Sequence, residues 1–216
     1  MNELLFFLTL CINFTCILLA FKLFGATGLY CWMVFGTVLA NIEVVKCVDL
    51  FGLSLTLGNV IYGSLFLVTD ILGAKYGIRA ARKAVFLGFA SMVAFTGLTQ
   101  INLLFEPNSA DFAAPAMETL FSLTPRVCIA SMAAFLVSNM LDTWLFHALH
   151  TCPLWVRNNG STFASQLVDS AIFTGLAFWG VFDSGVLFEL FCTTYIIKIL
   201  VAACDTPFLY LALKKA

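Results

Sequence analysis

Charged side chains are scarce in this chain. Lys, Arg, Asp and Glu make up 11% of its 216 residues, whereas 62% of the residues are hydrophobic. A soluble domain usually has about a quarter of its residues charged, because its surface faces water. The charge here is too sparse for such a surface, so we expect lipid to surround the chain. The net charge of −1 provides no basic field, and we predict no nucleic-acid partner.

Several chemical signatures are also missing. The eight cysteines include no C-x-x-C pair, so we interpret them as small apolar side chains and not as a disulfide or metal framework. No Gly-rich loop followed by Lys and Ser or Thr is present, which excludes ATP hydrolysis by that route. The paired-aspartate motifs of intramembrane proteases are absent as well. We therefore predict no cofactor, no metal and no enzymatic activity.

Long apolar runs dominate what is present. Seven runs are long enough to cross a hydrocarbon core, which takes about 20 helical residues. They cover residues 4–21, 29–47, 54–74, 83–105, 125–149, 162–182 and 186–213. Helices are expected because each backbone polar group in lipid must be satisfied within its own segment, and strand-like alternation is absent. The predicted fold class is all-α, a polytopic transmembrane helical bundle of about seven spans, in a single integral membrane domain covering residues 1–216.

The distribution of basic residues predicts the orientation. Cytoplasmic loops carry an excess of Lys and Arg, and alternate loops gather eight basic residues on one side: Lys22, Lys75, Arg79, Arg82, Lys83, Arg157, Lys214 and Lys215. The opposite loops hold only Lys46 and Arg126. We therefore expect the N-terminus outside and the C-terminus in the cytoplasm.

Five ionisable residues lie inside the predicted spans: Asp70, Asp142, Asp169, Lys198 and Asp205. Each costs about 2.5–3.5 kcal/mol at mid-membrane, so such groups usually face a cavity and mark function. At about 1.5 Å of rise per residue, Asp142, Asp169 and Asp205 lie at a similar depth on three different spans. We predict that these three carboxylates meet around one aqueous pocket on the cytoplasmic side of the midplane.

Amide side chains accompany two of these carboxylates. Asn139 precedes Asp142 by three residues and Gln166 precedes Asp169 by three, and residues at this spacing share a helix face. A carboxylate accepts two N–H bonds side by side, and an amide both donates and accepts. These pairs suit a planar heterocycle with a guanine-like edge.

The seventh predicted span adds a cation to this set. Lys198 shares a helix face with Asp205, which follows it by seven residues, and Tyr195 lies one turn before the lysine. Candidate rings for stacking on a heterocycle are Phe173, Trp179 and Tyr195.

Structural roles compete with these functional ones. Polar residues within spans also hold helices together; Asp70 is placed to pair with Lys75 or Arg79, and Lys198 to neutralise Asp205. The segment from Arg157 to Thr162 has the pattern of a turn followed by the N-cap of the sixth span. The alternative is a gating or substrate-contacting loop formed by Arg157, Asn158 and Asn159.

Several stretches form a pattern that is shared with known proteins: Thr56–Asn59, Thr69–Leu72, Tyr76–Gly77, Ala80–Lys83, Thr124–Arg126, Ser138–Trp144, Leu154–Thr162, Ser165–Ser170 and Thr193–Lys198. In these stretches the chain resembles the queuosine precursor transporters of the vitamin uptake transporter (VUT) family. The resemblance covers about residues 40–212, and Arg-Asn-Asn-Gly-Ser-Thr followed by Ser-Gln-Leu-Val-Asp is its most specific part. Asn139 departs from the family pattern, which often has Gln there. Shorter members lack the first span, so residues 1–28 are expected to form a peripheral extra helix beside a six-span core, residues 29–213.

The resemblance implies import of queuosine precursors into the cytoplasm for salvage. The candidate substrates are 7-cyano-7-deazaguanine, 7-aminomethyl-7-deazaguanine and queuine, and the expected location is the bacterial inner membrane. The expected substrate-binding residues are Asp70, Asn139, Asp142, Gln166, Asp169, Tyr195, Lys198 and Asp205. An alternative is the substrate-binding subunit of an energy-coupling-factor transporter. The partners compatible with these readings are the bilayer, a planar 7-deazapurine, a second copy of the chain and an energy-coupling module.

Overall fold

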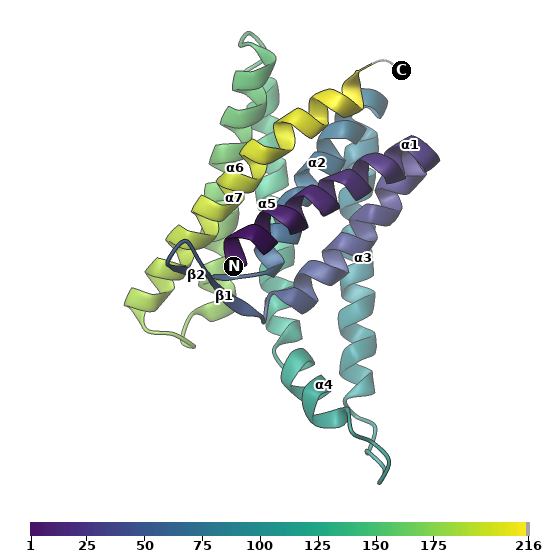
Figure 1. Ribbon diagram of the computed structural model, residues 1–216, viewed down its shortest axis with the longest axis vertical. Helices are drawn as coiled ribbons and strands as arrows, with labels where there is room; N and C mark the ends of the chain where they lie inside the picture. Colours follow the sequence, from purple (N-terminus) through teal and green to yellow (C-terminus); the bar gives the residue numbers. More distant parts are fainter. Residues whose placement is uncertain (215–216) are drawn as a thin grey trace.

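The computed structural model describes residues 1–214, without the side chains at positions 53, 54, 147, 154, 158 and 202. Its elements in chain order are α1 Asn2–Glu43, β1 Cys47–Leu50, β2 Leu53–Thr56, α2 Gly58–Tyr76, α3 Ile78–Asn102, α4 Ala114–Phe121, α5 Thr124–Ala148, α6 Leu154–Phe178 and α7 Ser184–Leu213. Long helices account for most of this part of the chain (Figure 1). The predicted all-α helical bundle is confirmed.

Four helical segments of the described chain are long and apolar enough to cross a membrane: Asn2–Glu43, Ile78–Asn102, Ala114–Phe146 and Ser184–Leu213. The helices α2 and α6 are outside this set because polar side chains lower their apolarity. Those side chains include Asn59 on α2 and Asp169 on α6, which both line the cavity described below. The chain is thus a membrane-integral bundle, and the count of seven spans stays a prediction.

The first two predicted spans are the two halves of α1. The chain folds back at Gly25, whose φ of 59° and ψ of −138° interrupt the helix (Figure 1). A positive φ of this kind is readily adopted only by glycine, which has no Cβ. The reversal brings the indole nitrogen of Trp32 within 3.2 Å of the Asn13 side-chain oxygen. Asn13 in turn donates to the Ser64 hydroxyl at 2.6 Å, which fastens the first half of α1 to α2.

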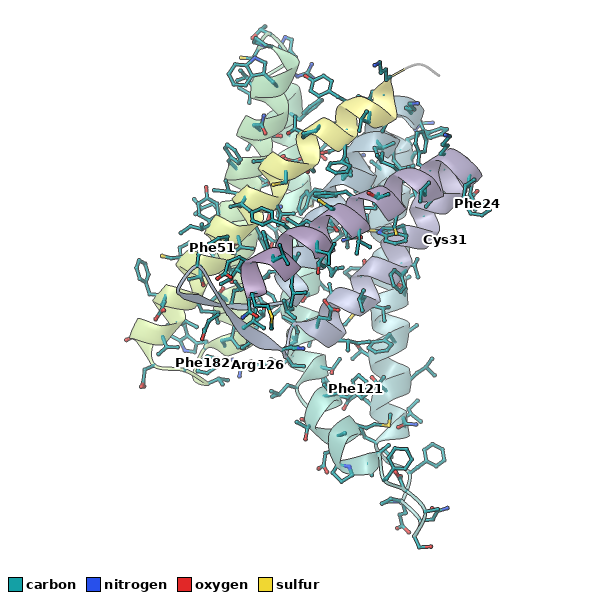
Figure 2. The ribbon with its side chains drawn as sticks, viewed as in Figure 1. Phe24, Cys31, Phe51, Phe121, Arg126 and Phe182 are labelled. Carbon is teal, nitrogen blue, oxygen red and sulfur yellow. The ribbon has the colours of Figure 1, made fainter. Side chains whose placement is uncertain are left out.

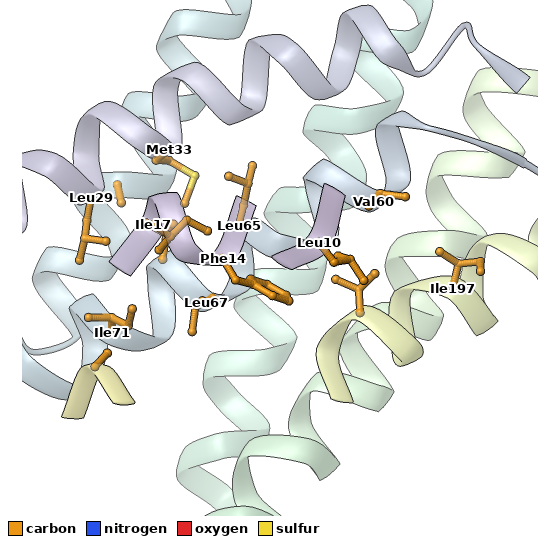
Figure 3. Packing of buried hydrophobic residues seen from close by; sticks show 14 of the residues in the cluster. Leu10, Phe14, Ile17, Leu29, Met33, Val60, Leu65, Leu67, Ile71 and Ile197 are labelled. Carbon is orange, nitrogen blue, oxygen red and sulfur yellow. The ribbon is translucent and has the colours of Figure 1, made fainter. Parts of the chain in front are cut away.

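This first half of α1 packs in the main hydrophobic core. Phe6, Leu10, Phe14 and Ile17 are each at most 4% exposed and belong to one cluster with residues of α2 and α7 (Figure 3). Burying such side chains contributes about 1.5–3 kcal/mol each. The first half of α1 therefore packs in the core, and none of residues 1–28 lines the cavity. A first span that is peripheral to the site stays a prediction.

A short β-hairpin between α1 and α2 was not expected from the sequence. Strands β1 and β2 pair antiparallel, and Phe51 and Gly52 form the two-residue turn with φ values of 53° and 79°. Positive φ at both central residues is the geometry that matches the twist of a tight hairpin. Leu50 and Leu55 are buried at 2% and 1% exposure. The predicted second and third spans, 29–47 and 54–74, overlap this hairpin at Cys47 and at residues 54–56.

The outside of the bundle is apolar. Phe24, Phe51 and Phe182 project away from the helices with exposed fractions of 67%, 53% and 45% (Figure 2). A large contiguous apolar surface is unusual for a soluble monomer. Helix α4, at one end of the bundle, buries none of its residues. This surface fits a chain whose solvent is lipid.

Candidate functional site

A cavity opens among the second half of α1 and helices α2, α5, α6 and α7. It encloses about 310 Å³ of space not filled by atoms, part of it open to the surroundings. Its lining residues are Ala40, Asn41, Val44, Gly58, Asn59, Tyr62, Ser131, Ala134, Asp169, Phe173 and Lys198. A second, apolar space of about 260 Å³ adjoins it toward α3 and shares Asn41, Tyr62 and Ser131.

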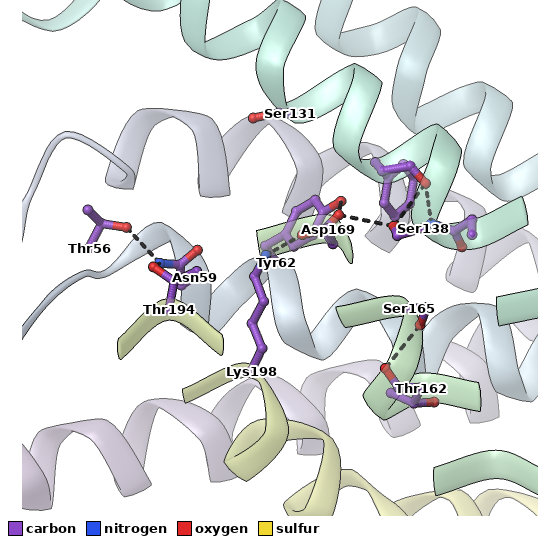
Figure 4. Close-up of polar contacts among 12 residues, drawn as sticks. Thr56, Asn59, Tyr62, Ser131, Ser138, Thr162, Ser165, Asp169, Thr194 and Lys198 are labelled. Atoms are coloured by element: carbon purple, nitrogen blue, oxygen red, sulfur yellow. Dashed lines mark hydrogen bonds and ion pairs between the residues drawn. The ribbon is translucent and has the colours of Figure 1, made fainter. Parts of the chain in front are cut away.

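A buried ion pair forms the charged wall of this cavity. The Lys198 ammonium on α7 contacts Oδ2 of Asp169 on α6, and the two side chains are 2% and 1% exposed. Oδ1 of Asp169 accepts the Tyr62 hydroxyl at 3.2 Å and the Ser138 hydroxyl at 3.0 Å (Figure 4). Helices α2, α5, α6 and α7 thus converge on one carboxylate. A buried charge is tolerated when it is paired and its lone pairs are satisfied.

The acceptor and donor capacity of this pair is not used up. A carboxylate offers about four lone-pair positions and an ammonium three N–H donors. Both positions on Oδ1 are filled by Tyr62 and Ser138, whereas Oδ2 receives only Lys198 among the described residues. The site therefore keeps one acceptor on Oδ2 beside two N–H donors of Lys198. An N–H group next to a C=O group on a ligand complements that arrangement.

Two aromatic rings flank the ammonium. The Lys198 nitrogen lies 5.0 Å from the ring centre of Tyr62 and 5.9 Å from that of Phe173. Both rings line the cavity. Aromatic faces stabilise a cation within about 6 Å and also stack on planar ligands. Of the three rings expected to stack, Phe173 reaches the cavity, whereas Trp179 lies beyond the end of α6 and is 73% exposed.

Amides from α1 and α2 complete the polar lining. Asn59 donates to the Thr56 and Thr194 hydroxyls at 3.0 and 3.2 Å, and Asn41 accepts the Ser131 hydroxyl at 3.2 Å. Gly58 makes this wall possible, because a Cβ built there would lie 2.3 Å from the Ala40 carbonyl oxygen. The lack of a side chain at Gly58 lets α2 approach α1 closely enough to close the cavity.

The structure does not bring Asp142, Asp169 and Asp205, which were expected to converge on one pocket, together in the lining of this cavity. Only Asp169 lines the cavity. Asp142 accepts the Ser165 hydroxyl at 3.3 Å, and its charge and that of Asp205 act on Asp70. The carboxylates therefore form two groups, Asp169 with its cation and an acidic group of Asp70, Asp142 and Asp205. Depth along the helices was predicted from residue spacing, but the rotation of each helix about its axis decides which acids meet.

Lys198 pairs with Asp169 across the bundle, and not with Asp205 on its own helix, which was the structural alternative for this lysine. Asp205 is 2% exposed, and its Oδ1 has no hydrogen-bond partner in the described part of the chain. Residues seven apart in a helix share a face, yet they lie about 10 Å apart along the axis. A carboxylate on the neighbouring helix at the same level is closer to the ammonium.

Three further expected site residues lie away from the cavity lining. The Asn139 amide donates to the Phe135 carbonyl of its own helix at 2.8 Å. Tyr195 donates to the Phe163 carbonyl at 3.4 Å. Gln166 is fully buried, and within the described residues neither its nitrogen nor its oxygen has a hydrogen-bond partner. Asn139 and Tyr195 thus bond to backbone carbonyls of the helices. The Gln166 amide, three residues before Asp169, keeps its hydrogen-bonding capacity unused among the described residues.

The expected loop from Arg157 to Thr162 is helical. Helix α6 begins at Leu154, eight residues earlier than predicted, because Pro153 precedes it with extended backbone. The Arg157 guanidinium donates to the Phe146 carbonyl at 3.2 Å and stacks on the Phe146 ring at 4.2 Å. This contact satisfies a carbonyl in the last turn of α5, so Arg157 fastens α5 to α6.

Asn158 and Asn159 are the other two residues of the expected loop. Asn159 donates to the Trp155 carbonyl of its own helix at 2.9 Å. The Asn158 side chain lies outside the described residues. At the opposite end of the same helix pair, the Arg126 guanidinium donates to the carbonyls of Leu176 and Trp179. An arginine at each end therefore joins α5 and α6.

Sequence reasoning missed five polar lining or supporting residues: Asn41, Asn59, Tyr62, Ser131 and Ser138. None of them is ionised at neutral pH, and the search for costly residues in the spans favoured charged ones. Asn59 lies in the Thr-Leu-Gly-Asn stretch that supported the family resemblance, which was the available signal. Ser138 directly precedes Asn139, and only the helix rotation shows that the serine faces Asp169.

Comparisons with known proteins agree with this picture. Residues 56–212 match the family described as "Putative vitamin uptake transporter". A "Probable queuosine precursor transporter" of Bacillus subtilis (strain 168) is 46% identical over 208 residues, which cover 94% of this chain and 91% of that protein. A protein of the same description from Haemophilus influenzae is 30% identical over 133 residues, which cover 60% of this chain and 54% of that protein. No solved structure matches the chain.

The family match includes every helix from α2 to α7, and the Bacillus relative aligns along nearly the whole chain. Both findings name transporters, which confirms the prediction that the chain is not an enzyme. The polar cavity inside an apolar helical bundle is what a membrane transporter of small molecules requires. On these grounds the chain belongs to the vitamin uptake transporter family.

Proposed function

We propose that the chain imports a queuosine precursor across the bacterial inner membrane into the cytoplasm for salvage. The candidate substrates are 7-cyano-7-deazaguanine, 7-aminomethyl-7-deazaguanine and queuine. The names of the two relatives support this assignment. The observation that carries it in the structure is the Asp169–Lys198 pair, which faces the cavity with unused hydrogen-bonding capacity.

The chemistry of these substrates fits the pair. A 7-deazaguanine presents an N–H group directly beside a C=O group on its six-membered ring. The N–H group would donate to the open position on Oδ2 of Asp169, and the C=O group would accept from Lys198. Hydrogen bonds to charged groups contribute about 1.5–3 kcal/mol each. Tyr62 and Phe173 would cover the ring faces, and the adjoining space toward α3 would accept the substituent at position 7.

In this proposal the remaining predicted site residues lie farther from the ligand. Gln166 lies on α6 one turn before Asp169, and its free amide would engage the substrate after a modest movement of α6. Asp70, Asp142 and Asp205 would face the path between the cavity and the cytoplasm. In this view the substrate meets Asp169 first and the acidic group only as it leaves the site.

The proposed orientation places the C-terminus in the cytoplasm. Lys75 lies over the Phe21 ring at 4.8 Å, so the fold-back of α1 and the end of α2 are adjacent. The end of α7 and the connection between α5 and α6 lie toward the same end of the bundle (Figure 1). Basic residues concentrate in these segments, and such segments face the cytoplasm. Tagging each end with a reporter that is active on only one side of the membrane would test this orientation.

Uptake by this chain alone would distinguish the proposal from a role as a subunit of an energy-coupling-factor transporter. Neither relative is named as such a subunit. The experiment expresses the chain in a host that cannot synthesise queuosine and has no coupling-factor module, and supplies each labelled precursor. Accumulation of at least one precursor supports the proposal. Failure of all three to enter, with the chain present in the membrane, would refute it.

Matched variants make the uptake experiment specific to the cavity. Asp169→Asn is expected to abolish accumulation, because the acceptor for the substrate N–H loses its charge. Asp183→Asn makes the same chemical change at an exposed position preceding α7 and is expected to leave accumulation unchanged. Equal loss of accumulation in both variants would show that the carboxylate in the cavity has no specific role in uptake.

A further inference from the structure

Asn59 is a buried amide whose two N–H groups are both engaged. They point to the hydroxyls of Thr56 and Thr194, at 3.0 and 3.2 Å, and the side chain is 4% exposed. No donor among the described residues reaches its Oδ1, and Asn59 lines the cavity (Figure 4). Two anchored N–H bonds fix the plane of the amide, so the oxygen is an oriented acceptor. An unused acceptor held in this way is suited to a ligand N–H group.

The position of Asn59 relative to the ion pair follows from helix geometry. Asn59 precedes Tyr62 by three residues on α2, and Thr194 precedes Lys198 by four on α7. The layer formed by Asn59 and Thr194 therefore lies about one helical turn, roughly 5 Å, from the layer that contains Asp169. A fused two-ring base with a hydrogen bond of about 3 Å at each end is longer than this step, so it would lie obliquely between the two layers.

On the basis of the proposed function, we infer that Asn59 recognises the pyrrole N–H of the 7-deazapurine by accepting a hydrogen bond from it. This group lies at the far end of the fused ring from the edge that faces Asp169 and Lys198. It is also the position that carries the ribose in a nucleoside. Asn59 is thus a specificity-determining residue that admits the free base and excludes nucleosides, because a substituted nitrogen offers no N–H and brings bulk against the amide.

The exclusion has two physical sources. Loss of the N–H leaves Oδ1 buried without a donor, and a polar group left unpaired lowers affinity more than the same contact raises it. The substituent must also enter a wall that is closely packed, since Gly58 beside Asn59 already lies against the α1 backbone. Sites that hydrogen-bond a ligand group reject analogues lacking that group more strongly than apolar pockets do.

The test measures binding to purified full-length protein in detergent. The ligands are queuine and the queuine analogue methylated on the pyrrole nitrogen. The wild-type protein is expected to bind queuine at least about tenfold more tightly than the analogue. In Asn59→Ala, queuine affinity falls about tenfold, and the analogue binds better than to the wild type because its methyl group fits the vacated space. The preference therefore disappears or reverses.

Two further variants separate recognition from folding. Thr194→Val removes one anchor of the Asn59 amide and is expected to reduce the preference partially. Asn13→Ala truncates an equally buried amide that bonds Ser64 outside the cavity, and its preference should equal that of the wild type. Because the preference is a ratio within one preparation, it does not depend on the fraction of folded protein.

The outcomes are distinct. A preference in Asn59→Ala equal to that of the wild type overturns the role of Asn59 while leaving the proposed function in place. A wild-type protein that binds queuine and the methylated analogue equally also overturns it. If the wild type binds neither queuine nor the two smaller precursors, the proposed function itself fails, and the inference fails with it.

Discussion

Asp169 and Asp205 are buried to the same degree on neighbouring helices, yet their surroundings are opposite. Asp169 has a cation and two hydroxyl donors and faces the cavity. Asp205 has one oxygen without any donor in the described chain, and its nearby titratable neighbour is another acid, Asp70. Burial of an acid in a span is therefore not enough to mark a binding site. The partners around the acid decide whether its charge and oxygens are satisfied, as in a binding site, or left unsatisfied.

This difference has consequences for how the two regions respond to substitution. Removing one member of a satisfied network leaves its partners unpaired in a low-dielectric interior, which is costly. Removing a charge that has no partner relieves a cost instead. The same Asp→Asn change should thus act in opposite directions at Asp169 and at Asp205, and the variants below follow from that contrast.

The largest effect is expected from breaking the ion pair. Asp169→Asn leaves the Lys198 ammonium buried without a counter-charge, which destabilises the fold by about 3–5 kcal/mol. Lys198→Met strands the carboxylate and should destabilise to a similar extent. Substrate affinity is expected to fall by about 100-fold in either variant. Thermal unfolding in detergent and equilibrium binding of queuine measure the two effects.

The double variant Asp169→Asn with Lys198→Met separates stability from binding. Both charges are gone, so most of the lost stability should return, because replacing a whole buried pair is often neutral. Binding should stay lost, because the acceptor and the donors for the substrate are both missing. A double variant that binds queuine as the wild type does would show that the pair only holds the helices together.

The Lys198 pairing also shows what sequence spacing does and does not predict. The apolar runs predicted the membrane class, the helices and the depth of each acid. Spacing rules such as i, i+3 and i, i+7 compare residues on one helix, and they paired Lys198 with Asp205. The observed partner, Asp169, is 29 residues away on another helix. Which faces of two helices meet depends on the packing of the whole bundle.

Two other departures have local causes. The hairpin at Cys47–Thr56 is apolar enough to be mistaken for the ends of two spans, and only the positive φ at Phe51 and Gly52 makes it turn. Helix α6 starts early because Pro153 precedes it with extended backbone, and Arg157 then contacts the end of α5.

An intermediate effect is expected from the two hydroxyls that satisfy Asp169. Ser138→Ala and Tyr62→Phe each remove one hydrogen bond to the carboxylate and leave its charge in place. A hydrogen bond to a charged group contributes about 1.5–3 kcal/mol, so queuine affinity should fall about tenfold or more in each. Titration of purified variants with queuine measures the change. Unchanged affinity in both would mean that the orientation of Asp169 does not depend on these donors.

A smaller effect, of opposite sign, is expected at the acidic group. Asp205→Asn removes a buried acid that must either hold its charge unpaired beside Asp70 or give it up, so stability should rise by about 1 kcal/mol. Queuine affinity should change less than about threefold, because Asp205 does not line the cavity. Thermal unfolding and queuine titration of the same preparation test both statements. If Asp205→Asn lowered stability instead, Asp205 would behave as Asp169 does, and the two acids would not differ in the way described.

The smallest effect is expected at Asn139, directly beside Ser138 in the sequence. Its amide donates to the Phe135 carbonyl one turn earlier, a carbonyl that the helix backbone already supplies with a donor. Asn139→Ala therefore leaves no group unpaired, and alanine favours the helix by a few tenths of a kcal/mol over asparagine. Stability should change by less than about 0.5 kcal/mol, within the range of substitutions away from special features, and queuine affinity should stay at the wild-type value. If Asn139→Ala weakened queuine binding as much as Ser138→Ala, the binding surface would have to include the other face of α5, and the cavity boundary described above would be wrong.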